Sequence, residues 1–135
     1  MRYLAIDLGD KRTGIAAGDD ITGVITPLEV ITVAPTLLLD ELLKSITTHK
    51  PDAIVLGVPL NMDGSEGAPA TRAREFGTTL SQRAGVPVHF QDERLTSYAA
   101  DKAMSQTGRT HKRKKELRDA LAAAEILRDY LESRG

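Results

Sequence analysis

The chain has 135 residues, of which 41% are hydrophobic and 27% charged, a composition typical of one soluble globular domain spanning residues 1–135. It contains no cysteine, which excludes a disulfide framework and a thiolate metal site and agrees with a reducing cytoplasm. The net charge of −1 gives no overall attraction to polyanions. No apolar run approaches the roughly 20 residues that cross a bilayer. The first residues lack the pattern expected of a signal peptide.

The first part of the chain is predicted to be an antiparallel meander. Strands are expected over residues 2–8, 13–17 and 23–33, separated by the glycine and aspartate turn signals at 9–12 and 18–20. Proline cannot donate a backbone hydrogen bond, so the third strand is expected to be interrupted at Pro27.

The pattern then changes to that of helices and buried strands. Pro35 begins a helix with apolar residues at helical spacing that stops at Pro51, and a continuous apolar strand follows at 53–58. The remaining elements are expected, in order, as a polar loop at 60–67, a helix ending near Gly85, a strand at 87–91, a helix at 97–106, a basic loop at 109–115 and a last helix at 116–131.

This order predicts an α/β fold: a five-stranded mixed sheet, three antiparallel strands followed by parallel strands, with helices on both faces. In open sheets of this kind, binding sites lie beyond the carboxyl ends of the parallel strands. Asp7, the loop at 60–67 and Glu93 all fall near such ends, so we expect them to contribute to one site.

Asp7 stands in a strand that is otherwise predicted to be buried. Alternation puts it on the face of Tyr3 and Ala5, opposite Ile6. A buried carboxylate is costly unless a cation or a hydrogen-bond donor meets it. Two interpretations are open at this point: a site for an ion or ligand, and an aspartate that accepts hydrogen bonds from the turn amides at Gly9.

Two later acids stand in comparable settings. Glu93 follows the strand at 87–91 beside Asp92, and alternation lets only one of the two face a shared site, with a solvated strand end as the alternative. Asp119 lies on an apolar stripe at the first turn of the last helix, where an acid that complements the helix dipole is the alternative. The helix dipole explains why an acid stands in the first turn, but it does not explain why Asp119 lies on the apolar side of the helix.

Three carboxylates without cysteine or paired histidines indicate hard oxygen ligation. Mg²⁺ or Mn²⁺ suits such ligands better than zinc does. Two such ions about 4 Å apart activate a water molecule and stabilise the leaving oxygen in phosphodiester hydrolysis. The sequence therefore predicts a metal-dependent phosphodiesterase site if Asp7, Glu93 and Asp119 converge.

Positive charge is concentrated just before the last helix. Five basic residues occupy seven positions there: Arg109, Lys112, Arg113, Lys114 and Lys115. A local patch of this kind can bind phosphates on a protein that is neutral overall, and a solvated basic loop is the alternative.

Four blocks of the sequence resemble the YqgF (RuvX) nuclease family. They are Ala5-Ile6-Asp7-Leu8-Gly9-Asp10-Lys11-Arg12-Thr13-Gly14, Val55-Leu56-Gly57-Val58-Pro59-Leu60-Asn61-Met62-Asp63-Gly64-Ser65, Asp92-Glu93-Arg94-Leu95-Thr96-Ser97 and Asp119-Ala120-Leu121-Ala122-Ala123. The blocks occur in the family's order and cover nearly the whole chain. The resemblance implies an RNase H-like fold, related to that of the RuvC-type Holliday junction resolvases, and a metal-dependent nuclease of the bacterial cytoplasm.

The resemblance also implies roles for particular residues. The catalytic and metal-binding trio becomes Asp7, Glu93 and Asp119, with Mg²⁺ or Mn²⁺ as the cofactor. The loop near the site contributes Asn61, Gly64 and Ser65, in a segment whose exposed amides suit the approach of a phosphate backbone. Contacts to nucleic acid are expected from Lys11, Arg12, Arg94, Arg109, Lys112, Arg113, Lys114 and Lys115.

The implied substrate is the 5′ end of precursor 16S rRNA, with junction resolution on branched DNA as the older alternative. No membrane partner is expected. The chain is expected to be a monomer or a homodimer, since a junction resolvase needs two sites. Aromatic residues make up only 4% of the chain and tryptophan is absent, so we expect recognition of backbone and shape, with strong salt dependence, rather than base stacking.

Two rival functions come from other classes. One is an ATPase of the actin and sugar-kinase type, which also opens with a strand, an aspartate and a glycine-bearing hairpin but needs two such domains around its nucleotide. The other is a non-catalytic nucleic-acid-binding module, which the basic residues alone would support. The buried carboxylates oppose it, because without metals they repel phosphates.

Overall fold

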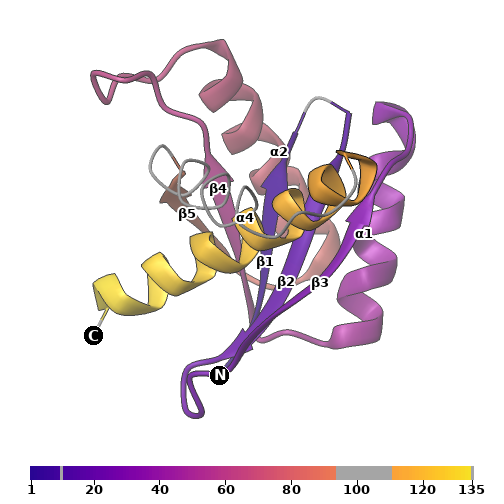
Figure 1. Ribbon diagram of the computed structural model, residues 1–135, viewed down its shortest axis with the longest axis vertical. Helices are drawn as coiled ribbons and strands as arrows, with labels where there is room; N and C mark the ends of the chain where they lie inside the picture. The colour runs from indigo at the N-terminus through magenta and orange to yellow at the C-terminus, as the bar shows by residue number, and fades with distance from the viewer. Residues whose placement is uncertain (10, 94–110, 135) are drawn as a thin grey trace.

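Five strands form one mixed sheet in the order β3-β2-β1-β4-β5 (Figure 1). The computed structural model describes residues 1–9, 11–93 and 111–134, and within 111–117 it describes the backbone alone. The helix expected at 97–106 lies outside the described residues, as do Arg94 and Arg109. The predicted architecture of three antiparallel strands followed by parallel strands is confirmed.

The antiparallel half is a meander of β1 (Arg2–Leu8), β2 (Thr13–Asp19) and β3 (Ile25–Ile31). β2 runs two residues further than expected, and β3 is shorter at both ends. Pro27 does not interrupt β3, because an edge strand tolerates a residue that donates no hydrogen bond. The irregularity is instead a bulge: the pairing shifts between Ile15 and Ala16, which leaves one extra residue on β3.

The parallel half is formed by β4 (Ala53–Val58) and β5 (Val88–Asp92), which follow β1 in the sheet. The helix α1 (Pro35–His49) connects the meander to β4, and α2 (Ala68–Ala84) connects β4 to β5. Each of these helices begins with a proline in its first turn and ends at a residue with positive φ whose amide bonds back into the last turn. Chain direction therefore brings the carboxyl ends of β1, β4 and β5 to one edge of the sheet.

The last helix, α4 (His111–Arg134), crosses one face of the sheet, and α1 and α2 cover the other (Figure 1). The expected loop at 109–115 is wrong from His111 onward, since these residues form the first turns of α4. Lysine and arginine are good helix formers, and neither glycine nor proline separates them from the apolar part of the helix. The helix therefore begins five residues earlier than predicted and ends three residues later.

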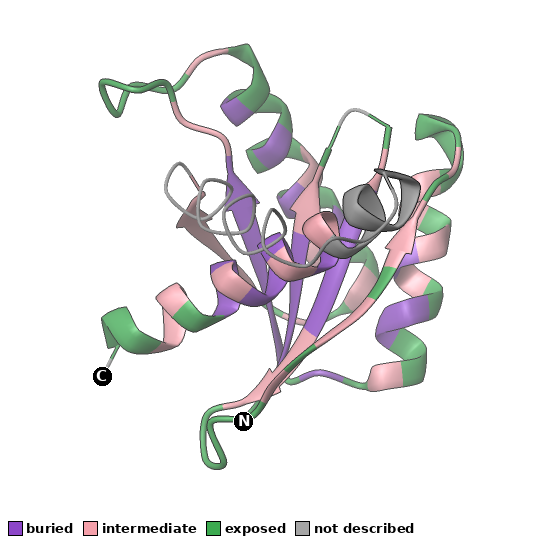
Figure 2. Ribbon diagram, in the orientation of Figure 1, coloured by how far each residue is buried: buried purple, intermediate pink, exposed green. Residues whose placement is uncertain are grey.

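Two apolar clusters fill the two layers, and the purple core of Figure 2 follows the central strands and the inner side of α4. Against α1 and α2 the core is made of large aliphatic residues: Leu4, Ile6, Ile15, Leu42, Ile46, Ile54, Leu56 and Leu80. Against α4 most of its members are small: Tyr3, Ala5, Ala16, Ala53, Val55, Ala123, Ala124, Ile126 and Leu127. The predicted alternation along β1 is confirmed, because Tyr3 and Ala5 face α4 while Leu4 and Ile6 face the other layer.

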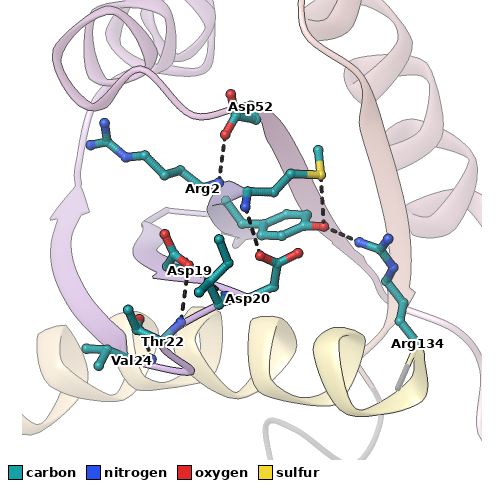
Figure 3. A network of polar contacts seen from close by, with 10 residues as sticks. Arg2, Asp19, Asp20, Thr22, Val24, Asp52 and Arg134 are labelled. Atoms are coloured by element: carbon teal, nitrogen blue, oxygen red, sulfur yellow. Dashed lines mark hydrogen bonds and ion pairs between the residues drawn. The ribbon is translucent and has the colours of Figure 1, made fainter.

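A polar network ties the two ends of the chain together at the edge opposite the carboxyl ends (Figure 3). The α-amino group of Met1 forms an ion pair of 2.8 Å with Asp20, and the amide of Arg2 donates to Asp52 at 2.8 Å. Arg134 at the end of α4 donates to the hydroxyl of Tyr3. Within the described ranges, none of the helices combines the length and the apolar character needed to cross a bilayer.

Candidate active site

Asp7 lies near the carboxyl end of β1, on the face that α4 covers. It is directly opposite Gly14 of β2 in the antiparallel register. A β-carbon at residue 14 would collide with the backbone carbonyl of Asp119 on α4. Gly14 therefore lets the backbone of α4 lie against the sheet beside Asp7, and this close approach brings the first and third predicted acids to the same place.

Glu93 follows β5 and turns its carboxylate onto β4. Its amide donates to the carbonyl of Val58 at 3.3 Å, which continues the parallel ladder one residue beyond the strand. Its Oε2 lies too close to the place of a β-carbon at residue 57 for both to fit, so any side chain there would displace the carboxylate. Of the pair Asp92 and Glu93, it is Glu93 that lies beside Asp7.

Burial and like charge dominate the electrostatics of these acids. Burial raises the pKa of Glu93 to about 9, and the neighbouring Asp7 carboxylate adds to the rise. Burial also raises the pKa of Asp7; a hydrogen bond with Glu93 offsets part of the rise, while the charge of Asp119 adds to it. With no cation present, Glu93 therefore keeps its proton at neutral pH and lies in a hydrogen bond with Asp7.

One atom of this pair is left without a partner. In the part of the chain that the structure describes, Glu93 Oε2 is buried and accepts no hydrogen bond. A buried, unsatisfied carboxylate oxygen costs free energy, so such groups usually meet a proton, a donor or a cation. The donor set consists of carboxylate oxygens, which are the ligands that Mg²⁺ and Mn²⁺ prefer, and a divalent cation fits it.

Asp119 is close to this pair but is held by another residue. Arg12, just after the turn between β1 and β2, donates from Nε to Asp119 Oδ2 at 2.7 Å. Among the described side chains, no three acids or histidines are arranged as the ligands of one metal ion. The three predicted acids are thus neighbours at one edge of the sheet, with Asp7 and Glu93 paired and Asp119 bound to Arg12.

The other predicted contacts are placed less completely. Lys11 and Arg12 line a cleft of about 300 Å³ together with Gly9 and Asp119. Residues 112–115 are helical, but their side chains lie outside the described residues. Phosphate binding by these residues stays a prediction.

The loop after β4 is ordered by its own hydrogen bonds. Asn61 N donates to Ser65 O at 2.9 Å, Gly64 N donates to Asn61 O at 2.8 Å, and Ser65 N donates to Asp63 Oδ1 at 2.9 Å. Asn61, Gly64 and Ser65 are all exposed, but their amides are used within the loop. The expected approach of a phosphate to free amides here therefore needs the loop to open.

Two glycines of the site were not singled out from the sequence. Gly57 makes room for the Glu93 carboxylate, and Gly14 makes room for the backbone of Asp119. A glycine inside an otherwise apolar strand is a sign of close approach, so Gly57 between Leu56 and Val58 was a readable signal. Gly14 carried no such signal, because it follows a turn in which glycine is common.

A family model described as RuvX, Holliday junction resolvase, matches residues 1–133 of this sequence. The chain belongs to the RuvX family. Relatives of this RuvX chain agree: a protein of Agathobacter rectalis named "Putative pre-16S rRNA nuclease" is 38% identical over 98% of this chain and 95% of its own length. A protein of the same name from Ruegeria pomeroyi is 44% identical over 94% of this chain and 83% of its own length. Membership gives the chain the enzyme class of a nuclease, a hydrolase.

Several solved structures similar to this RuvX chain are junction resolvases. Thermus thermophilus RuvC in complex with a Holliday junction substrate matches with a TM-score of 0.60 at 18% identity, covering 99% of this chain and 95% of that one. The Holliday junction resolvase of fowlpox virus matches with a TM-score of 0.62 at 15% identity, covering all of both chains. Likeness at this level of identity shows the fold, and the predicted RNase H-like fold is confirmed.

The sugar-kinase rival also has a structural counterpart. A ROK family protein from Streptococcus pneumoniae, in complex with sucrose, matches with a TM-score of 0.50 at 17% identity. The match covers 75% of this RuvX chain but only 37% of that protein. The shared part is a common fold, and the larger part of that protein lies outside the match.

Proposed function

We propose that this chain is a divalent-metal-dependent nuclease, that Asp7, Glu93 and Asp119 are its catalytic acids, and that its substrate is the 5′ end of precursor 16S rRNA. The observation that carries the proposal is the buried pair of Asp7 and Glu93 with its unsatisfied oxygen at the carboxyl edge of the sheet. Two adjacent buried carboxylates add nothing to stability on their own, and their pKa shifts are typical of a functional site. The family match supports nuclease chemistry, and the names of the relatives support RNA as the substrate.

The fit between these residues and a divalent cation rests on Asp7 and Glu93, with Asp119 as the third ligand. A bound divalent cation would stabilise the negative charge on the phosphoryl oxygens and would lower the pKa of a water molecule. A pair of carboxylates alone does neither. Either Mg²⁺ or Mn²⁺ suits the oxygen ligands. Asp7 and Glu93 would hold such a cation as carboxylates, since a cation favours the charged form of both groups.

The protein's own side chains then position the substrate. Lys11 and Arg12 line the cleft beside Asp119 and can neutralise non-bridging phosphate oxygens. Alanine and glycine on the sheet face under α4 let the α4 backbone lie against the strands, which keeps Asp119 beside Asp7. Holding the phosphate against the acids in one orientation supplies a large part of the rate enhancement in such a site.

A second candidate substrate is branched DNA. The likeness to two junction resolvases with TM-scores of 0.60 and 0.62 supports it. Cutting a junction symmetrically needs two sites, so this alternative requires a homodimer, whereas processing of an RNA end does not. The mass of the protein in solution, measured at the concentration of the cleavage assay, separates the two requirements.

The test compares Asp7→Asn with Asp52→Asn in a cleavage assay. Asp52 is an acid at the opposite edge of the sheet that accepts a hydrogen bond from Arg2, so its variant controls for loss of a carboxylate as such. With Mg²⁺ or Mn²⁺, Asp7→Asn should lose at least about a thousandfold in rate, the scale of removing transition-state charge stabilisation, while Asp52→Asn keeps the wild-type rate. Cleavage that survives in Asp7→Asn, or in EDTA, contradicts the proposal.

The same assay decides the substrate. Precursor 16S rRNA fragments and four-way DNA junctions are offered to the wild-type chain at equal concentration and at several salt concentrations, because binding to a phosphate backbone weakens steeply with salt. Faster cleavage of the RNA supports the proposed substrate. Preferential cutting of the junction favours the resolvase alternative, and binding of both without cleavage favours the non-catalytic module.

A further inference from the structure

The ion pair between Arg12 and Asp119 links residues 107 positions apart in the chain. It is partly exposed, with 30% of the Arg12 side chain and 20% of the Asp119 side chain accessible to water. Another pair on the same helix, Arg128 with Glu125, joins neighbouring turns and lies on its outer side. The Arg12–Asp119 pair differs from this local pair, because Arg12 comes from a distant part of the chain and binds an acid of the candidate active site.

Charge balance explains why an arginine is needed there. Asp7, Glu93 and Asp119 are three neighbouring acids, and like charges at such a place repel one another. The structure pairs Asp119 with the guanidinium of Arg12. Arg12 thus supplies beside Asp119 a positive charge of the kind that a bound cation would supply.

We propose that Arg12 is an exchangeable counter-ion: it holds Asp119 while no divalent cation is bound, and it moves to a phosphate oxygen of the substrate when Asp119 becomes a metal ligand. The inference rests on the proposed metal-dependent function and adds an order of events to it. The binding of the cation and the binding of nucleic acid are then positively coupled, because the cation releases Arg12 from Asp119 and the released Arg12 can bind a phosphate.

The geometry of the contact suits such an exchange. Arg12 bonds Asp119 through Nε, and the planar guanidinium also carries terminal nitrogens, whose N–H groups match the oxygens of a phosphate. A partly exposed ion pair is a weak constraint in water, so it gives way to a divalent cation more readily than a buried pair does. The cleft of about 300 Å³ between Lys11, Arg12 and Asp119 gives the guanidinium space in which to move.

The first experiment measures the binding of Mn²⁺ alone, by titration calorimetry, to the full chain and to Arg12→Ala. Arginine competes with the metal for Asp119, so its removal should tighten Mn²⁺ binding by about fivefold or more, the usual lower range of coupling between neighbouring sites. Arg128→Ala is the control: it removes one positive charge from the exposed side of the same helix and should change the affinity by less than about twofold. In Arg12→Ala combined with Asp119→Asn the gain should vanish.

Thermal unfolding checks that the variants fold. If Arg12→Ala is unstable, the Mn²⁺ titration is repeated with Arg12→Gln, which keeps much of the length and the polarity of the side chain without its charge. Mn²⁺ affinity that is unchanged or lower in both variants overturns the exchange, because a residue that merely positions Asp119 gives that result. Absence of Mn²⁺ binding to the wild type and to both variants overturns the metal-dependent function itself. The two failures are therefore distinguishable.

The second experiment measures the binding of a fluorescent single-stranded RNA in Ca²⁺ and in EDTA. With the cation present Arg12 is free for phosphate, so Arg12→Ala should weaken RNA binding by about five- to tenfold, the value of one good phosphate contact. In EDTA the arginine is bound to Asp119, and the same variant should change the affinity by less than about twofold. An equal loss in both conditions contradicts the exchange.

Discussion

The two faces of the sheet differ in the size of their side chains. The face under α1 and α2 carries leucine and isoleucine, whereas the face under α4 carries alanine and glycine at most positions along β1, β2 and β4. Large aliphatic side chains hold a helix at the usual distance and bury much apolar area. Small ones let α4 come so close that its backbone contacts Gly14.

The two faces of the sheet therefore have different roles: one contributes most of the apolar burial, and the other carries the acids of the proposed active site. The aliphatic face holds none of the three proposed catalytic acids, and Asp7, Glu93 and Asp119 all lie on the α4 side of the sheet. Charged groups on the α4 face cost stability through burial and repulsion, and the aliphatic layer on the other face offsets that cost. Substitutions on the two faces should consequently fail in different ways.

The largest contrast is expected between Gly57→Ala and Gly77→Ala. Both add one methyl group to a crowded site: residue 57 meets the Glu93 carboxylate on the α4 face, and residue 77 meets the ring of Phe90 on the other. Each should lower the free energy of unfolding by about 1–3 kcal/mol through overpacking. Only Gly57→Ala should also lose about a hundredfold in cleavage rate per folded molecule, because it displaces a catalytic acid. Equal rates in the two variants contradict a positioning role for Gly57.

Leu56→Ala tests the aliphatic face by removing volume. Leu56 is fully buried between the sheet and α2, so truncation should cost about 2–5 kcal/mol of stability, measured by chemical denaturation. The cleavage rate of the molecules that remain folded should stay near the wild-type value. A specific loss of rate would show that this layer also positions the acids.

The pH dependence of stability tests the acids on the α4 face. Folding raises the pKa of Glu93 from 4.5 to about 9, so between these values the folded, metal-free chain holds a proton that the unfolded chain releases. Stability in EDTA should therefore fall as pH rises through this window, with a slope of at most about 1.4 kcal/mol per pH unit from this group. Glu93→Gln should flatten the slope in thermal unfolding measured from pH 5 to pH 9. A slope that is the same in Glu93→Gln would mean that other groups cause it.

The smallest effect is expected from Arg128→Ala. This arginine pairs with Glu125 within α4 on the exposed side of the helix, away from both faces of the sheet. An exposed pair of this kind contributes about 0.3–0.5 kcal/mol, so thermal unfolding should shift slightly and cleavage should not change. A larger effect would indicate that the outer side of α4 takes part in binding.

Much of this arrangement could be predicted from the sequence, because it follows from periodicity. The alternation around Asp7 and the apolar stripe of Asp119 fix the faces of β1 and α4, and together they predict that the two acids meet. The start of α4 could not be predicted in the same way. A run of lysine and arginine has no apolar period, so loop and helix look alike until Leu117.

The partners of the acids were also beyond sequence reasoning. Arg12 was expected to contact phosphate, and its bond to Asp119 depends on a tertiary contact that no local pattern encodes. The hydrogen bonds inside the loop at 61–65 were missed for a related reason, since glycine and serine give the same signal whether their amides are free or used. The residue types predict which chemistry a site can support, but which charged side chains pair with one another depends on the three-dimensional structure.

The position of α4 at the end of the chain has a consequence for the growing polypeptide. β1, β2, α1 and β4 leave the ribosome before Asp119 does, and contacts between residues so far apart in sequence form late, after a long loop has closed. A nascent chain therefore carries Asp7 without Asp119. If Asp7 and Asp119 act together as proposed, a nascent chain gains the competence to cut nucleic acid only near the end of translation.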